Sequence, residues 1–144
     1  MENHSEFARS RWNKCFGCGE GNPGGLKLKF KWDGNKAVAE FTPGEMHAGW
    51  PGVVHGGLLA TMLDEAAGWS ALERGIDMVT AKMEVLFRNP ARIGVPLIIT
   101  GAITRENTKR FEAYSSITTR DGAMIAECNS VYIIKAGGPQ DARR

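Results

Sequence analysis

Residues 26–41 alternate apolar and polar side chains with a period of two, a pattern typical of β-strands that keep one face in solvent. In the first run the apolar positions alternate with three lysines: Leu26, Leu28, Phe30 and Trp32. The turn sequence Asp33-Gly34-Asn35 separates this run from a second one over residues 36–41. Two successive strands are therefore predicted, and regular structure is expected to begin at Leu26.

Residues 57–74 predict one long helix. The segment before it, residues 42–55, contains two prolines and three glycines and sustains neither period, so we expect a loop there. The helical run contains no proline, repeats apolar residues at helical spacing and is stopped by Gly75. Because the helix is apolar on nearly every side, it is expected to be buried.

The second half of the chain is rich in β-forming residues. Strands are predicted over residues 79–87, 96–105, 110–119 and 123–135, with turn residues between them. Two strands, a buried helix and four further strands indicate an α+β fold in which an antiparallel sheet wraps around one helix. We expect an exposed edge or face on this sheet, which a two-fold dimer would usually cover.

The length of 144 residues fits a single domain. The polar start and the Gly-rich and Pro-rich stretch that follows it predict an amino-terminal arm over residues 1–25. The domain proper is then expected over residues 26–135, with a flexible tail over residues 136–144.

Composition and charge narrow the class of partner. Eighteen Lys and Arg against 16 Asp and Glu leave a net charge of +2, which favours a small molecule or a protein over nucleic acid or an anionic membrane. No apolar run approaches the roughly 18 residues of a membrane span, and the polar start lacks a signal-peptide core, so a cytoplasmic location is expected. Three cysteines in such a chain are expected to be free thiols.

The predicted helix carries the first candidate chemistry. Between residues 56 and 72 its only ionisable side chains are Asp64 and Glu65. Asp64 falls on a small, polar stripe with Gly57, Thr61 and Gly68, and a desolvated Asp facing a cleft can act as a general base or a nucleophile. The alternative is that both acids face solvent on a half-exposed helix.

His55, Gly56 and Gly57 lie where the loop becomes the helix. Open N–H groups at the positive end of a helix suit a developing oxyanion, although a Gly-Gly pair can equally be a flexible N-cap with no ligand. Gly56 and Asp64 are eight residues apart, or about 12 Å along one helix at 1.5 Å per residue. Both can reach one carbonyl only if they come from different chains, so this mechanism requires a dimer with two identical sites.

Three segments resemble a known family. The sequence VVHGGLLATMLDEAAG (53–68) is similar to the His-Gly-Gly, six residues, Asp signature of hotdog-fold acyl-CoA thioesterases of the phenylacetic-acid-degradation (PaaI-like) type. CFGCGEGNPGGLKLKF (15–30) resembles the start of one branch, and VTAKMEVLFRNPARIGVPL (79–97) resembles the strand after the helix. The resemblance covers roughly residues 15–135. It implies a hotdog fold, with a sheet of about five to six strands around a long central helix, and homodimers that pair into homotetramers.

The resemblance also implies roles for individual residues. Asp64 would be the general base or nucleophile, and Gly56 of the partner chain would polarise the thioester carbonyl through its N–H. Thr80 would orient the attacking water or the Asp64 carboxylate, and His55 would shape the carbonyl site. Some members carry an Asn or Gln before His-Gly-Gly, but Met46–Val54 contains neither, and His47 is the only obvious polar side chain there.

Further residues are candidates for binding the substrate. Arg88 and Asn89 would contact CoA phosphates, although surface solubility explains them equally well. Trp50 would line the acyl pocket from the loop. The remaining candidates lie on the helix or in the loop before it: His47, Gly57, Thr61 and Glu65.

The function implied is hydrolysis of an acyl-CoA thioester, with CoA arriving as part of the substrate and no cofactor. Two alternatives remain open: a non-catalytic acyl-CoA binding domain, and a hotdog dehydratase or hydratase, whose motif His47 resembles faintly but whose acid is replaced by Thr61-Met62. Cys15-x-x-Cys18 invites a zinc or redox interpretation. Because structural zinc needs about four ligands and no second Cys pair exists, we expect no metal.

Overall fold

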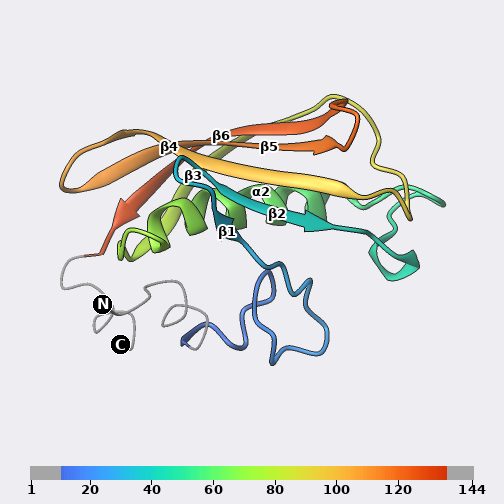
Figure 1. The fold of residues 1–144 in the computed structure, drawn as a ribbon, viewed down its shortest axis with the longest axis horizontal. Coiled ribbons are helices and arrows are strands. Elements are labelled where there is room, and N and C mark those ends of the chain that lie inside the picture. Colours follow the sequence, from blue (N-terminus) through green and yellow to red (C-terminus); the bar gives the residue numbers. More distant parts are fainter. Residues whose placement is uncertain (1–10, 136–144) are drawn as a thin grey trace.

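The computed structural model describes residues 11–135, which form one antiparallel sheet and one α-helix (Figure 1). The elements in chain order are β1 (Lys31–Trp32), β2 (Ala37–Phe41), the 3₁₀ turn η1 (Glu45–His47), α2 (Gly56–Leu72), β3 (Met78–Phe87), β4 (Leu97–Glu106), β5 (Arg110–Thr119) and β6 (Met124–Ile134). The strand order is β1-β2-β4-β5-β6-β3, and every neighbouring pair is antiparallel. The predicted α+β architecture, a sheet wrapped around one helix, is confirmed.

Helix α2 forms the centre of the core. The sheet covers one side of it, and the segment before β1 lies on the other side (Figure 1). Met62, Leu63 and Ala66 have no exposed surface, and burying a Leu or Met side chain contributes roughly 1.5–3 kcal/mol. Gly101 of β4 lies directly against the backbone of Ala66, where a Cβ atom would overlap the Ala66 carbonyl oxygen. A residue without a side chain therefore allows helix and sheet to approach closely.

The first predicted strand is wrong in extent. Only Lys31–Trp32 pair with β2, although Leu26, Leu28 and Phe30 are buried as the alternation requires. The backbone N–H groups of Leu26 and Leu28 instead donate to the carbonyl oxygens of Phe16 and Gly17, at 2.8 and 2.9 Å. The period-two burial is therefore real, but the backbone of Leu26 and Leu28 bonds to the preceding arm rather than to the sheet.

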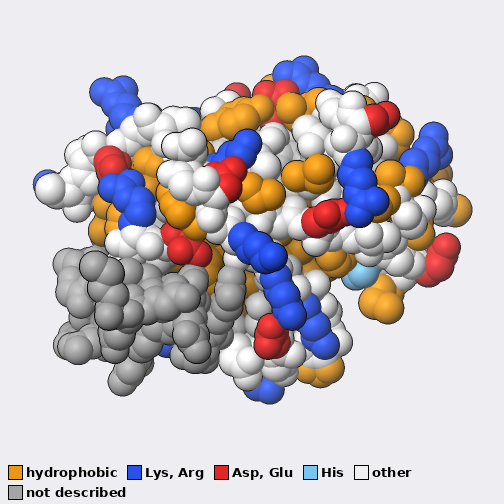
Figure 2. Space-filling view, viewed as in Figure 1, with side chains coloured by type: hydrophobic (Ala, Val, Ile, Leu, Met, Phe, Trp, Pro, Cys, Tyr) orange, Lys and Arg blue, Asp and Glu red, His pale blue; other side chains and the backbone are white. Residues whose placement is uncertain are grey.

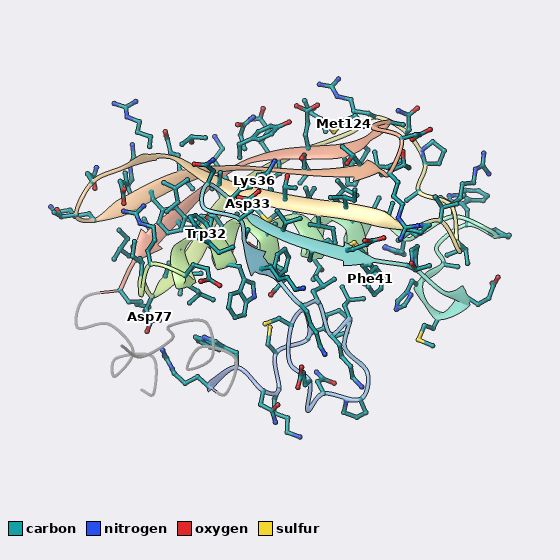
Figure 3. The ribbon with its side chains drawn as sticks, viewed as in Figure 1. Trp32, Asp33, Lys36, Phe41, Asp77 and Met124 are labelled. Carbon is teal, nitrogen blue, oxygen red and sulfur yellow. The ribbon has the colours of Figure 1, made fainter. Side chains whose placement is uncertain are left out.

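The other predicted elements lie close to their expected bounds. The helix begins at Gly56, one residue early, because His55 is its N-cap, and it ends at Leu72. The predicted turn after β1 is present, with Asp33 Oδ1 accepting the N–H groups of Asn35 and Lys36 (Figure 3). The predicted tail, residues 136–144, and the first ten residues of the predicted arm lie outside the described residues.

Strand β3 forms one edge of the sheet and is exposed along most of its length. Three of its apolar side chains are more than two-fifths exposed: Val79, Leu86 and Phe87. The expected exposed edge is therefore confirmed. On the face in Figure 2, basic and acidic side chains are interspersed. Within residues 11–135, no helix combines the length and apolar character needed to cross a membrane.

Candidate active site

The carboxylate of Asp64 is held in place by two hydroxyl groups from the sheet. Thr80 Oγ1, on β3, donates a hydrogen bond of 2.8 Å to Asp64 Oδ1, and the hydroxyl of Tyr132, on β6, donates one of 2.8 Å to the same oxygen. The Tyr132 hydroxyl also lies 3.2 Å from the Asp64 carbonyl oxygen. No other described side chain hydrogen-bonds to this carboxylate, so Oδ2 is available to a substrate or a water molecule.

Tyr132 was not predicted from the sequence. Burial, followed by the negative charge of Asp64, raises its pKa well above the usual value for tyrosine, so the hydroxyl stays protonated and donates. Its ring stacks on Phe111 with centroids 4.8 Å apart, which fixes the position of the hydroxyl. Tyr132 and Thr80 are register partners across β3 and β6, so the sheet itself brings the two donors together.

Asp64 opens onto a cavity of about 170 Å³ between α2, the sheet and the amino-terminal arm. Thr80 and Tyr132 line it beside the carboxylate. Most of the rest of its wall comes from large apolar side chains: Trp12, Trp69, Leu72 and Met78. An apolar cavity beside a reactive carboxylate can hold a hydrocarbon or aromatic group.

The amino-terminal end of α2 forms a second hollow, of about 450 Å³, lined by Gly56 together with the loop before it. His55 Nδ1 accepts the N–H of Gly57 at 2.9 Å, so Gly57, predicted to bind substrate, has its N–H occupied. The Gly56 N–H has no hydrogen-bond partner among residues 11–135, and the 83% exposed Trp50 lies beside it in the same hollow. Gly56 is thus the open donor at the positive end of the helix.

Asp64 and Gly56 face different hollows of the same chain. They are eight residues apart on one helix, about 12 Å along its axis. One chain by itself therefore does not bring the carboxylate and the open N–H to a single carbonyl group.

Two of the predicted binding residues have local structural roles. The Thr61 hydroxyl donates to the carbonyl of Gly57 at 3.1 Å, one turn earlier on α2, and Thr61 is not among the residues lining the Asp64 cavity. His47 Nδ1 accepts the N–H of Gly44 at 2.9 Å, and its ring packs edge-on against Phe41 at the end of β2 (Figure 3).

Arg88 and Asn89 follow β3 directly. Arg88 Nε lies 3.0 Å from Glu127 Oε2, and Asn89 Nδ2 donates to the Met124 carbonyl at 2.7 Å. Met124 marks the β5–β6 turn, at the opposite end of the molecule from Asp77 (Figure 3). Both side chains thus fasten the end of β3 to β6, and half of the Arg88 side chain remains exposed.

Glu65, the neighbour of Asp64, contacts the arm rather than the sheet. Its Oε1 lies 3.4 Å from Cys15 Sγ. Burial, with the nearby charge of Cys15, raises the pKa of Glu65 to about 8. A hydrogen bond from Cys18 lowers the pKa of Cys15 to about 5 and raises that of Cys18.

The fold and the acid on its central helix define a hotdog-fold protein. Residues 51–126, more than half of the chain, match the family model of the thioesterase superfamily. The chain belongs to the thioesterase superfamily.

Similar proteins agree with this assignment. Acyl-coenzyme A thioesterase 13 of Mus musculus is 30% identical over 95 residues, covering 64% of this chain and 68% of that protein. Acyl-coenzyme A thioesterase THEM4 of Xenopus laevis is 29% identical over 99 residues, 68% of this chain, and this match spans only 45% of that longer relative.

Two solved structures share the fold. The E. coli PaaI protein, from the phenylacetic acid degradation operon, superposes with a TM-score of 0.78 at 16% identity, covering 96% of this chain and 99% of PaaI. A hypothetical thioesterase of Streptococcus pneumoniae, solved with coenzyme A, superposes with a TM-score of 0.71 at 18% identity, covering 75% of this chain and 85% of that one.

Proposed function

We propose that the protein hydrolyses an acyl-CoA thioester to a carboxylic acid and CoA. The observation that carries this proposal is the Asp64 carboxylate, which lines the cavity and whose Oδ1 accepts hydrogen bonds from Thr80 and Tyr132, while no described side chain hydrogen-bonds to Oδ2. The family assignment and the CoA bound to a streptococcal protein of the same fold support a CoA thioester as substrate.

The reaction needs one group to supply the nucleophile and one to bind the carbonyl oxygen. Asp64 Oδ2 either attacks the thioester carbon or removes a proton from the water that attacks it. The carbonyl oxygen becomes negative, and the Gly56 N–H at the start of α2 stabilises it. In the water route, the C–S bond breaks when the intermediate collapses, and the proton that Asp64 removed passes to the CoA sulfur. In the nucleophilic route, breaking the C–S bond leaves an acyl-Asp64 anhydride and a CoA thiolate; water then hydrolyses the anhydride to the free acid and the Asp64 carboxylate, and the thiolate takes up a proton from that water.

The two groups meet across a two-fold dimer, which the 12 Å separation within one chain requires. The exposed edge of β3 is suited to this contact, because an unpaired edge strand with apolar side chains is an unfavourable surface for a monomer. Pairing two copies of β3 would place the helices beside each other in opposite directions, with Gly56 of one near Asp64 of the other.

The remaining predicted residues would bind the substrate at two places, near the thioester and at the CoA phosphates. Trp50 would contact the thioester region from the hollow around Gly56, and the exposed part of Arg88, with Asn89 beside it, would meet the CoA phosphates. No cofactor is needed, since the substrate carries its own CoA. The hydratase alternative has less support, because His47 lines neither hollow and its Nδ1 is occupied by Gly44.

The first experiment follows thiol release from phenylacetyl-, benzoyl-, short-, medium- and long-chain acyl-CoAs, with Asp64→Asn in parallel. We expect Asp64→Asn to lower the rate at least roughly 100-fold while the fold is retained. Binding of CoA without turnover of any substrate would instead identify a binding domain. A single turnover in ¹⁸O-labelled water tests the nucleophilic role, since label found in Asp64 requires water to have attacked the Asp64 carbon of an acyl-Asp64 anhydride.

Gly56→Pro tests the shared site. Proline removes the N–H and is well tolerated at the first helical position, and His55 already has the extended ψ of 130° that proline requires before it. Each single variant, Gly56→Pro or Asp64→Asn, should be inactive. A mixture of the two allowed to exchange chains should recover roughly a quarter of the wild-type rate, because each mixed dimer contains one intact site. Failure to recover would show that the site lies within one chain.

A further inference from the structure

The arm before β1 folds against α2 and brings three metal-binding side chains together. The ligand atoms of Cys15, Cys18 and Glu65 all lie within 4.8 Å of one another. Cys15 Sγ and Glu65 Oε1 are 3.4 Å apart, close to the separation of about 3.5 Å between a sulfur and an oxygen ligand on one tetrahedral zinc ion. The three donors thus already have the spacing of a ligand set.

The turn that carries the two cysteines is closed by backbone hydrogen bonds. The Gly19 N–H donates to the Cys15 carbonyl oxygen at 2.8 Å, and the Cys15 N–H donates to the Trp12 carbonyl oxygen at 2.8 Å. A Cβ at position 19 would overlap the backbone of residues 13 and 15, so glycine allows the turn to close. The closed turn brings the two sulfur atoms together beside Glu65, in the arrangement that a metal ion would bind.

Glu65 reaches the turn because residue 17 has no side chain. A Cβ at Gly17 would overlap the Glu65 carboxyl group. No Lys or Arg among residues 11–135 forms an ion pair with Glu65, and Arg11 of the arm pairs with Asp77 instead. Burial beside two thiols disfavours the ionised form of Glu65, and a bound cation would favour that form by balancing its charge.

We propose that Cys15, Cys18 and Glu65 bind a zinc-class divalent cation that fastens the arm to α2 beside Asp64. Two sulfur ligands and one carboxylate suit zinc, which accepts S and O donors in tetrahedral geometry. The fourth position faces the cavity that also contains Asp64, and water occupies it. On binding, the protons still carried by the three ligand groups are released to solvent.

This proposal replaces the expectation of no metal drawn from the sequence. That expectation required four ligands and found only one pair of cysteines close together in the sequence. Glu65 lies 50 residues after Cys15 and reaches the turn only in the folded protein. Three protein ligands and one exchangeable position also suffice for zinc sites that are not purely structural. The inference does not rest on the proposed hydrolysis, since it concerns binding alone.

Cobalt binding tests the site in the full chain. Protein stripped of metal by a chelator and kept in a non-thiol reductant is titrated with Co²⁺, and then Zn²⁺ is added to displace it. We expect one Co²⁺ per chain, with the thiolate-to-cobalt charge-transfer and intense visible bands of a tetrahedral site. X-ray absorption of the zinc-loaded protein should count two sulfur ligands.

Three variants remove one ligand each: Cys15→Ser, Cys18→Ser and Glu65→Gln. Each should weaken Co²⁺ binding at least roughly 100-fold, since even residues that only support a ligand cost 10–100-fold. Matched controls are Glu20→Gln, an exposed carboxylate of the same arm, and Cys128→Ser, the buried thiol of β6, and both should bind as the wild type does.

Circular dichroism of the metal-free variants shows whether each one folds. The number of Co²⁺ ions per chain and the number of sulfur ligands are measured on the wild-type protein, so these two results do not depend on the folding of any variant. Reduced wild-type protein that takes up no Co²⁺, or that binds it without a thiolate band, would overturn the proposal. So would binding that survives all three ligand substitutions. None of these outcomes depends on whether the protein hydrolyses acyl-CoA.

Discussion

At the scale of single residues, the proposed chemistry depends on how Asp64 is oriented. Two hydroxyl groups bind the same carboxylate oxygen, which fixes the carboxylate and leaves the other oxygen without a side-chain hydrogen bond among residues 11–135. Tyr132 is therefore a positioning residue: it acts on the substrate only through Asp64.

Tyr132→Phe should lower kcat by roughly 10-fold or more, because a hydrogen bond to a charged group contributes roughly 1.5–3 kcal/mol. KM should change little, and the ring should keep its stacking on Phe111. Steady-state kinetics with the preferred acyl-CoA measures both constants.

Tyr114→Phe is the matched control, since it is the only other tyrosine of the chain and its hydroxyl bonds Glu127 rather than Asp64. Its kcat should remain near the wild-type value. Equal losses in both variants would show that the effect is a general one on the sheet, and a role for Tyr132 in orienting Asp64 would then be rejected.

Asp64 and Thr80 could be predicted from the sequence, and Tyr132 could not. Asp64 is one of two ionisable residues on an apolar helix, and Thr80 lies in a segment that resembles a family. Tyr132 is 68 residues from Asp64, on a strand whose alternation marks it only as a buried aromatic residue. Knowing the register in which β3 pairs with β6 would have identified Tyr132, because Tyr132 pairs with Thr80.

At the scale of elements, the contact between α2 and β4 sets the distance between the helix and the sheet. Gly101 permits the backbone of β4 to lie against Ala66, and helix and sheet would have to separate for any larger residue. The cavity beside Asp64 lies between the same helix and the same sheet, so this distance also affects the site.

Gly101→Ala should lower the free energy of unfolding by about 1–3 kcal/mol or more, because the core is overpacked at a rigid backbone contact. Chemical denaturation in urea measures the change. Gly24→Ala is the control: a Cβ there would meet only Asn22 Oδ1 at an ordinary 3.7 Å, so a change within about 0.5 kcal/mol is expected. A stable Gly101→Ala protein would contradict the close approach.

The observed bounds of a strand match those predicted from side-chain alternation where the strand pairs within the sheet. They differ where the backbone bonds to the amino-terminal arm instead. Strand β5 spans residues 110–119 as predicted, because its alternation and its turns agree. Residues 26–30 show the same alternation, yet the N–H groups of Leu26 and Leu28 donate to carbonyl oxygens of the arm. Alternation reports which side chains are buried; it carries no information on which backbone is the hydrogen-bond partner.

At the scale of the whole molecule, the exposed edge strand β3 is the surface through which we propose that two chains pair. Its end carries Phe87, more than half exposed and next to Gly56 at the start of α2. An interface along this edge would cover the apolar side chains and the hollow around Gly56 together.

Phe87→Glu should therefore shift the protein from two chains to one in analytical ultracentrifugation and remove most of the hydrolysis. Burial of an unpaired charge at an interface is strongly unfavourable, whereas the same change on a free surface costs little. Trp32→Glu, at the opposite edge of the sheet on β1 (Figure 3), is the control and should leave mass and rate unchanged. A Phe87→Glu protein with unchanged mass would exclude the β3 edge as the interface.

The sequence by itself determined the succession of strands and helix, the burial of that helix and the position of Asp64 on it. These properties are local, since the periodicity of side chains and the residues of turns are set within a few positions along the chain. The tertiary structure alone decided that Tyr132 binds one oxygen of Asp64, and that Glu65 meets Cys15 and Cys18. These contacts join residues more than 40 positions apart in the chain. They depend on strand register and on where the arm folds back, and no local pattern encodes either one.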